Sequence, residues 1–385
     1  MIPYGRQHIS EADIQAVVAV LKSDFLTQGP AVPAFEQAVC DYTGARYGVA
    51  VNSGTSALHL ACLALGLGEG DWLWTSPITF VASANCGLYC GAQVDFVDID
   101  PATGNLSARQ LAIKLQRARQ ANCLPKIVVA VHLSGLSCDM AALLELSHVY
   151  GFHLIEDACH ALGGRYRNQP IGSCYYADIT VLSFHPVKTM TCGEGGMALT
   201  NDSAYASKMA RLRSHGITRD PTLMTQPPDG PWYYQQIELG FNYRMTDIQA
   251  ALGLSQLQRL TAMVARRHAI AHQYDALLSD LPLQLPYRAS DQYSGLHLYV
   301  IRLQGDALLK NHTQIFAFMR EQGIGVNLHY IPVHLQPYYQ RMGFGHGDFP
   351  HAEAYYQAAI TIPLFPDLSD RDIHTVVRVI RESLQ

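Results

Sequence analysis

Short apolar runs alternate along the chain with longer stretches in which apolar residues recur every three or four positions. The short runs predict β-strands, and the longer periodic stretches predict amphipathic helices. We expect strands at residues 47–51, 93–99, 126–132, 153–156, 179–184 and 196–200. We expect helices at residues 10–22, 56–65, 107–119, 140–150, 204–214, 246–278, 313–322 and 370–384.

This alternation predicts an α/β domain with a mostly parallel central sheet. Strands that are apolar throughout are typical of a sheet covered on both faces. Beyond about residue 265 the pattern changes to a smaller α+β unit, with strands expected near 296–303 and 325–330. We therefore expect a large domain over residues 1–250 and a small C-terminal domain over residues 251–385.

One segment, residues 217–236, follows neither pattern and is rich in proline and polar residues. A loop of this length in a compact protein usually has a function, often as a lid. We expect it to help shield a binding site.

Composition narrows the class of protein. Hydrophobic residues make up 49% of the 385 residues and charged residues only 15%, which favours large buried surfaces, including a subunit interface. The net charge of −5 lacks the basic excess that is typical of nucleic-acid binding. The chain has no apolar run long enough to span a bilayer and no signal-peptide pattern at its start, so we expect a cytoplasmic protein that does not bind membranes. The nine cysteines include no Cys-x-x-Cys pair, so we expect reduced thiols and no metal site.

Three places just after predicted strands have residues suited to binding a ligand, because ligands of open α/β sheets lie beyond the carboxyl ends of the strands. The first is the turn from Asn52 to Leu58. Gly54 allows close approach of the backbone, and the hydroxyls of Thr55 and Ser56 with the free N–H groups of a helix start favour an anion such as phosphate. A plain strand–helix turn with a serine cap is the alternative.

The second place is Asp157, which directly follows the apolar run of its strand, with His160 three residues further on. An ionised carboxylate there can pair with a cation or with a protonated ring nitrogen. A helix N-cap with a surface histidine is the alternative interpretation.

The third place is Lys188, which lies between Ser183 and the glycine-rich stretch 193–196. Lysine is scarce in this chain compared with arginine, and a lysine in a crevice is the usual residue that forms a Schiff base. The alternative is an exposed loop lysine.

Together the three places offer a phosphate cradle, a carboxylate for a pyridinium nitrogen and an amine for an aldehyde. This is the set of groups that pyridoxal 5′-phosphate (PLP) requires. Phe80, which follows another strand, can stack on the cofactor ring, although a core phenylalanine is the simpler interpretation of that residue alone.

The residues that carry these features form longer motifs. They are NSGTSAL at 52–58, PITFVASAN at 77–85, IEDACHALGG at 155–164, SFHPVKTMTCGEGG at 183–196 and GFNYRMTDIQAALG at 240–253. Over nearly its whole length the chain resembles the PLP-dependent sugar aminotransferases of the DegT/DnrJ/EryC1/StrS family. The resemblance implies an aspartate-aminotransferase-like type I fold and a homodimer whose two active sites lie at the interface.

The resemblance also implies roles for the motif residues. Lys188 would form the Schiff base and move the proton, Asp157 would pair with the ring nitrogen, and His160 would lie beside the ring. Phe80 would stack on it, and Asn242 would reach the phosphate from the partner subunit, whereas the role of Arg244 stays open. The phosphate itself would be bound by Gly54, Thr55, Ser56 and Ser183.

Shorter motifs point to one branch of the family. PYGRQ, SDFLTQGP, RSHGITRD and HYIPVH resemble the branch that aminates C4 of UDP-4-keto-6-deoxy-N-acetyl-L-altrosamine with L-glutamate, in pseudaminic acid biosynthesis. In that branch the sugar nucleotide would contact Tyr4, Phe25, Leu26, Thr27, His185, His329 and Tyr330.

Several points stay open. Many relatives have Tyr at the position of His185 and Gln at that of His160. Tyr4 and Phe25 can instead pack at a dimer interface. The alternative substrates are other GDP- or dTDP-linked keto sugars, aminated at C3 or C4. A sugar dehydratase, which would have His in place of Lys188, and a regulatory module that binds PLP without turnover are further alternatives.

Overall fold

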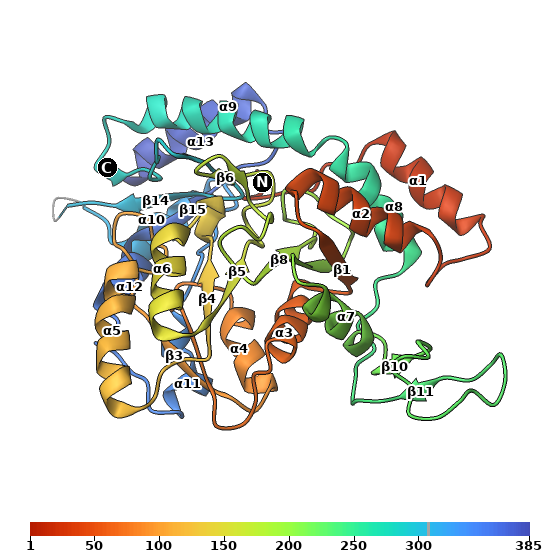
Figure 1. Cartoon of the computed structure of the whole chain (residues 1–385). Coiled ribbons are helices and arrows are strands. Elements are labelled where there is room, and N and C mark those ends of the chain that lie inside the picture. Colours follow the sequence, from red (N-terminus) through yellow and green to blue (C-terminus); the bar gives the residue numbers. More distant parts are fainter. Residues whose placement is uncertain (306–308) are drawn as a thin grey trace.

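The computed structural model describes residues 1–305 and 309–385. Its centre is a seven-stranded sheet, buried between helices (Figure 1). In spatial order the strands are β1 (Tyr47–Val51), β9 (Gly196–Thr200), β8 (Ile179–Ser183), β5 (His153–Asp157), β4 (Ile127–Val131), β2 (Trp72–Thr75) and β3 (Gln93–Phe96).

The sheet is mostly parallel, as predicted. Strands β8, β5, β4, β2 and β3 pair in parallel, whereas β9 runs antiparallel to both of its neighbours, β1 and β8. Because β9 reverses direction between them, β1 and β8 point the same way, and their carboxyl ends reach the same edge of the sheet as those of the parallel strands.

Helices cover both faces of the sheet, which explains why its strands are apolar throughout. One face packs against α3 (Gly54–Ala64), α4 (Ala82–Tyr89) and α7 (Ser203–Leu212). The other face packs against α2 (Ala31–Thr43), α5 (Ala108–Ala121), α6 (Met140–Tyr150) and α8 (Asp247–Leu257). Helix α1 (Glu11–Leu21), which packs on α8, begins at the expected capping box, in which the Ser10 backbone N–H donates to Asp13 across 2.8 Å.

The C-terminal part has a core of its own. It combines the long helix α9 (Leu260–Leu278), α10 (His312–Glu321) and α13 (Asp370–Ser383) with a small antiparallel sheet. The strands of that sheet are β12 (Leu283–Gln284), β14 (Tyr299–Leu303) and β15 (Ala359–Ile362). The turns η1 (Leu133–Gly135) and η2 (Val333–Leu335) and the helices α11 (Pro337–Gln340) and α12 (Pro350–Ala358) pack instead in the core of the central sheet. A small sheet joins β13 (Gln292–Tyr293), β6 (Arg165–Tyr166) and β7 (Gln169–Pro170). The division of the chain at residue 250 stays a prediction.

Two sequence predictions need correction, and several elements were missed. The helix expected over residues 246–278 is two helices, because the chain changes direction at Gln258 and Arg259, between α8 and α9. The strand expected over residues 325–330 is a single bridge from Asn327 to Thr361, and β15 supplies the strand instead. The sequence pattern did not predict helices α2, α4, α11 and α12, and it gave no bounds for strand β2.

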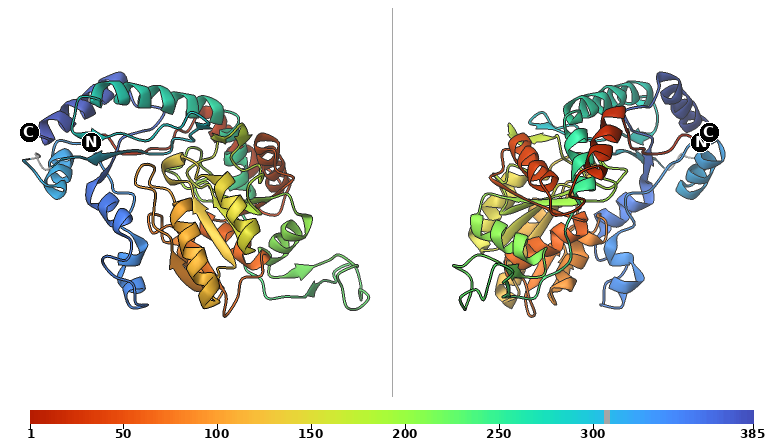
Figure 2. Two further views of the ribbon diagram at one scale, coloured as in Figure 1. Left: turned by 60° about the vertical axis from the view of Figure 1, so that its left-hand side comes forward. Right: turned by 90° about the vertical axis from the view of Figure 1, so that its right-hand side faces the viewer.

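The segment 217–236 leaves the body of the molecule as a narrow arm (Figures 1 and 2). A short hairpin of β10 (Ile217–Thr218) and β11 (Gln235–Gln236) forms its base. Within the described chain, no residue of this arm lines the main cavity, so it is not a lid over the site of its own chain. Among the described helices, none is both long and apolar enough to cross a membrane.

Candidate active site

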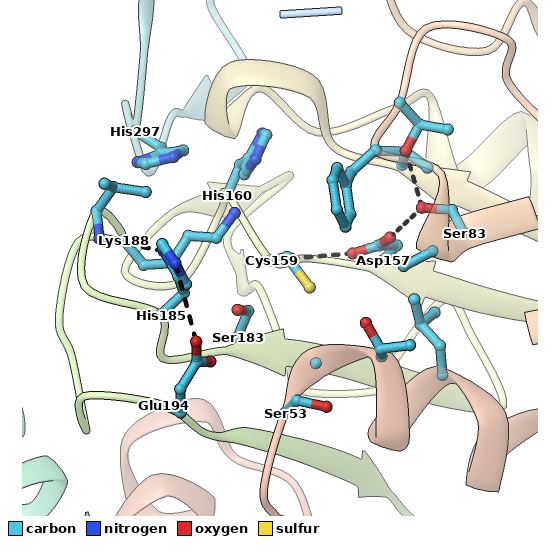
Figure 3. Close-up of a pocket in the computed structure, with 18 of the residues that line it drawn as sticks. Ser53, Ser83, Asp157, Cys159, His160, Ser183, His185, Lys188, Glu194 and His297 are labelled. Atoms are coloured by element: carbon cyan, nitrogen blue, oxygen red, sulfur yellow. Dashed lines mark hydrogen bonds and ion pairs between the residues drawn. The ribbon is translucent and has the colours of Figure 1, made fainter. Parts of the chain in front are cut away.

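A cavity of about 820 Å³ lies at the edge of the sheet where the strands end. Its floor comes from the residues that follow β1, β2, β5 and β8, and its roof comes from the C-terminal part and from Tyr4. Figure 3 shows Lys188, His160 and His297 on one side of this cavity and Asp157 with Ser83 on the other. The prediction that three strand ends meet at one ligand site is therefore consistent with the structure.

The start of α3 forms a tight turn at the floor. Ser53 caps the helix by accepting a hydrogen bond of 3.1 Å from the Ser56 backbone N–H. A Cβ at Gly54 would lie 3.1 Å from Cβ of Ser183, and a Cβ at Gly196 would overlap the carbonyl oxygen of Ser53. Both glycines are therefore needed for the close approach of α3, β8 and β9. The free N–H groups of the helix start face the cavity edge and suit a phosphate.

Asp157 is a buried carboxylate without a cation. It is 5% exposed, and it accepts hydrogen bonds from the Ser83 hydroxyl (2.7 Å) and the Cys159 backbone N–H (3.2 Å). No lysine, arginine or histidine of the described chain forms an ion pair with it. Buried charges are usually paired, so this arrangement fits a cationic ligand atom such as a protonated ring nitrogen.

Lys188 is an unpaired amine in the same cavity. Its backbone N–H donates to the carbonyl of His185 across 2.9 Å, but its Nζ has no hydrogen-bond or ion-pair partner among the described residues. Burial lowers the pKa of Lys188, and the charges of Cys159 and Asp157 oppose that shift only in part. A lowered pKa increases the fraction of free amine, which is the nucleophilic form.

A wall of neutral side chains closes the cavity above Lys188. The backbone N–H of Ser134 donates to Nδ1 of His160 (3.3 Å), so the hydrogen of this ring lies on Nε2, which is 3.2 Å from the Tyr330 hydroxyl. Burial and the charge of Lys188 lower the pKa of His160 well below its usual range. Tyr330 keeps its proton, because burial and Asp157 raise its pKa.

His329 is a further neutral side chain of this wall. Its ring is 2.8 Å from the Thr361 hydroxyl, and burial lowers the pKa of His329 to about 4.

Most of the predicted site residues line this cavity. They are Tyr4, Gly54, Thr55, Ser56, Phe80, Asp157, His160, Ser183, His185, Lys188, His329 and Tyr330. Phe80 is 59% exposed on the cavity wall, where an aromatic ligand can stack on it. His185 lies at the rim, 3.9 Å from the exposed carboxylate of Glu194 (Figure 3).

Four predicted residues lie outside the cavity. Phe25 and Leu26 are exposed, and Thr27 forms a bridge to Thr246. Asn242 is exposed on the segment that leads from the arm back to the body. Arg244 donates to the hydroxyl of Ser214 across 3.0 Å and does not line the cavity either. The roles assigned to these residues stay predictions.

Sequence reasoning missed several residues of the cavity. Ser83, Cys159 and Glu194 lie inside the motifs quoted above. The motifs therefore indicated that these residues lie near the site, but not which groups they contact. His297 had no such signal, because it comes from the C-terminal part and reaches the cavity only through tertiary packing.

Comparisons with known proteins agree with this chemistry. Residues 7–381 match the DegT/DnrJ/EryC1/StrS aminotransferase family. The spore coat polysaccharide biosynthesis protein SpsC of Bacillus subtilis (strain 168) is 39% identical over 384 residues, which cover 99% of this chain and 96% of SpsC.

Two solved structures are similar over the whole chain. Helicobacter pylori PseC, an aminotransferase involved in the biosynthesis of pseudoaminic acid, superposes with a TM-score of 0.91 at 29% identity and covers 100% of this chain and 99% of PseC. Spr1654 from Streptococcus pneumoniae, in its PMP-form, superposes with a TM-score of 0.89 at 30% identity, with 100% of both chains covered. The chain therefore belongs to the DegT/DnrJ/EryC1/StrS aminotransferase family, with its type I fold, with PLP as cofactor and with transamination of a nucleotide sugar as its reaction.

Proposed function

We propose that this enzyme transfers the amino group of L-glutamate to C4 of UDP-4-keto-6-deoxy-N-acetyl-β-L-altrosamine. The observation that carries the chemistry is that two groups lie in one cavity. One is the amine of Lys188, which has no partner among the described residues, and the other is the buried carboxylate of Asp157, which has no counter-charge there. The choice of sugar is supported by the motifs PYGRQ, SDFLTQGP, RSHGITRD and HYIPVH and by the similarity to PseC over the whole chain.

The residues of the cavity have distinct tasks in this proposal. The start of α3, from Gly54 to Ser56, would hold the cofactor phosphate together with Ser183, and Phe80 would stack on the ring. When bound, PLP supplies an electron-accepting ring that stabilises negative charge at the carbon that loses a proton. Asp157 would keep the ring nitrogen protonated, because its buried negative charge favours a cation beside it.

Lys188 is the base and acid of the proposed mechanism. Its Nζ takes the proton from the α-carbon of L-glutamate and, in the second half of the reaction, delivers a proton to C4 of the sugar. The lowered pKa suits both tasks, since a group that titrates nearer to neutral pH can accept and return a proton readily.

We also propose a homodimer in which each chain completes the site of the other. The arm projects from the body with the exposed apolar side chains of Trp232 and Tyr234, and Leu239, just after the base of the arm, is exposed as well. Asn242 lies outside the cavity of its own chain. Of the described lining residues, Lys188 is the only lysine or arginine, so a nucleotide diphosphate would need cations from elsewhere. Light scattering tests this assembly: Leu239→Ser with Trp232→Ser should yield monomers, whereas Leu309→Ser, an exposed apolar residue far from the arm, should not.

The substrate is tested with a panel of UDP-, GDP- and dTDP-linked keto sugars and with L-glutamate as the donor. The amino product should form with the UDP-linked 4-keto sugar and be identified by NMR of the purified sugar nucleotide. Efficient amination of a GDP- or dTDP-linked sugar, with no reaction of the UDP-linked sugar, would replace the proposed substrate while leaving the family chemistry intact.

A further inference from the structure

His297 is a buried polar side chain that the proposed mechanism does not yet use. It lines the cavity and is 3% exposed, yet neither ring nitrogen has a hydrogen-bond partner among the described residues. Its Nδ1 is sealed from solvent, whereas Nε2 retains access to the cavity. Unpartnered buried polar groups are rare in folded proteins and call for an explanation.

The position of His297 is determined by its backbone and its neighbours. The carbonyl of His297 accepts a hydrogen bond of 3.1 Å from Arg267, which is itself fully buried. A Cβ at Gly295 would lie 2.7 Å from backbone atoms of Ala161, so this chain segment packs directly on the loop that carries His160. The two imidazole rings are 4.5 Å apart between centroids (Figure 3). This packing holds the His297 ring beside Lys188.

The unpartnered Nδ1 indicates which tautomer the ring adopts. A buried N–H without an acceptor is the rarer and costlier defect, and a lone pair without a donor is tolerated better. Nδ1 therefore carries the lone pair and Nε2 carries the hydrogen. Burial and the charges of His160, Lys188 and Arg267 lower the pKa of His297 well below its usual range, so the ring is neutral at physiological pH.

A neutral N–H donor beside the reactive amine suits one kind of ligand atom. A carboxylate, as in the amino donor, is usually bound by a cation such as arginine. A ketone oxygen is uncharged, and a neutral imidazole can polarise it without giving up its proton. The position beside Lys188 places this donor where the carbonyl carbon of the acceptor substrate must react.

We propose that His297 donates a hydrogen bond from Nε2 to the keto oxygen of the nucleotide-linked sugar; this proposal rests on the function proposed above. The hydrogen bond orients the ketone against Lys188 and draws electron density from the carbon that is to be aminated. His297 would thereby contribute to the sugar half of the reaction and not to the glutamate half.

Two substitutions separate this role from simple packing. His297→Phe keeps a ring against His160 but removes both nitrogens, and His297→Gln loses the ring but can place an amide N–H near the position of Nε2. With each half-reaction measured in a single turnover, His297→Phe should slow amination of the keto sugar about tenfold and change the glutamate half by less than about twofold. His297→Gln should recover part of the sugar half.

Other outcomes overturn the proposal. If His297→Phe is as fast as the wild type, or more active than His297→Gln, then the ring has a packing role. If the glutamate half slows instead, or both halves slow equally, the keto oxygen is not the acceptor. If the wild type aminates no keto sugar, the proposed function is wrong, and His297 is then tested only by the tautomer measurement described below.

The tautomer is measured without turnover, on the full-length PLP-free protein. With ¹⁵N-labelled histidine, the NMR signals that disappear in His297→Phe or His297→Gln should be those of a neutral ring with its hydrogen on Nε2. A ring with its hydrogen on Nδ1, or an imidazolium at pH 7, would overturn the proposal even if both variants folded poorly.

Discussion

Ser83, near the start of α4, donates a hydrogen bond of 2.7 Å to Asp157, at the end of β5. The carboxylate can only accept, so the hydroxyl of Thr79, 2.8 Å from Ser83, must in turn donate to Ser83. This short chain of hydroxyls compensates in part for burying a carboxylate that has no cation in the described chain.

Ser83→Ala should therefore weaken PLP binding. The buried carboxylate would lose one of its two hydrogen-bond donors, so it would be held less firmly as the negative partner of a protonated ring nitrogen. We expect the dissociation constant of PLP, measured by fluorescence titration, to rise about tenfold, and the protein to lose about 1–2 kcal/mol of stability.

Ser147→Ala is the matched control. Ser147 is also buried, and its hydroxyl donates to the carbonyl of Leu144 within α6, away from the cavity. A similar loss of stability without a change in PLP affinity is expected. Equal effects of both variants on PLP affinity would contradict a specific role for Ser83.

Lys188 provides a prediction about pH. Because its pKa is lowered by burial, the rate at which the PLP-free protein takes up PLP should rise with pH and level off at a lower pH than an ordinary lysine would allow. The negative charge of Asp157 raises the pKa of Lys188, and Asp157→Asn removes that charge. In this variant the rate of PLP uptake should therefore begin to rise at a still lower pH. Stopped-flow absorbance measures both profiles.

Lys188→Ala and Lys188→Arg should both lose transamination by at least about 10²- to 10⁴-fold, since neither supplies a free amine. Binding of the sugar nucleotide, measured by calorimetry, should be retained. Normal turnover by Lys188→Ala would remove this lysine from the mechanism.

Gly196 provides a prediction about packing. A methyl group there would overlap the Ser53 carbonyl, so Gly196→Ala must displace the turn that starts α3. We expect a stability loss of about 1–3 kcal/mol in urea unfolding and weaker binding of PLP through its phosphate. Gly68→Ala is the control, because a Cβ at Gly68 would meet no other atom within 4 Å. A Gly196→Ala protein as stable as Gly68→Ala would contradict the close packing.

The buried histidines predict sensitivity to acid. The pKa of His329 is lowered to about 4 in the folded protein, from about 6.5 in an unfolded chain. Between about pH 4 and pH 6.5, His329 binds a proton in the unfolded state but not in the folded state. The free energy of unfolding therefore falls as the pH decreases through this window, by roughly 3 kcal/mol for His329 alone. His160 and His297, whose pKa values are also lowered, act in the same direction.

Urea unfolding of the PLP-free protein at several pH values measures this effect. His329→Phe should reduce the loss of stability between pH 6.5 and pH 4, although it costs the contact with Thr361. The exposed His374→Phe on α13 should leave the pH dependence as in the wild type. An unchanged slope in His329→Phe would show that His329 is not a neutral buried group.

The strand pattern predicted six of the seven strands of the central sheet, and the motifs predicted most of the residues that line the cavity floor. Each of Gly54, Asp157 and Lys188 is placed by a strand end a few residues away, and a parallel sheet brings such ends to one edge. The periodicity could not reveal the break between α8 and α9, because both helices keep an apolar face while the chain changes direction.

The sequence by itself thus determined the fold class and, through its family motifs, the cofactor, since strand ends and local motifs encode both. The roles of Lys188 and Asp157 stay predictions. Only the tertiary structure decided the roof of the cavity. His297 comes from the C-terminal part, far from His160 and Lys188 in the sequence, and it reaches the cavity only because this part packs against the loops at the sheet edge. The protonation states of His160 and His297 follow from that burial and not from their neighbours in sequence.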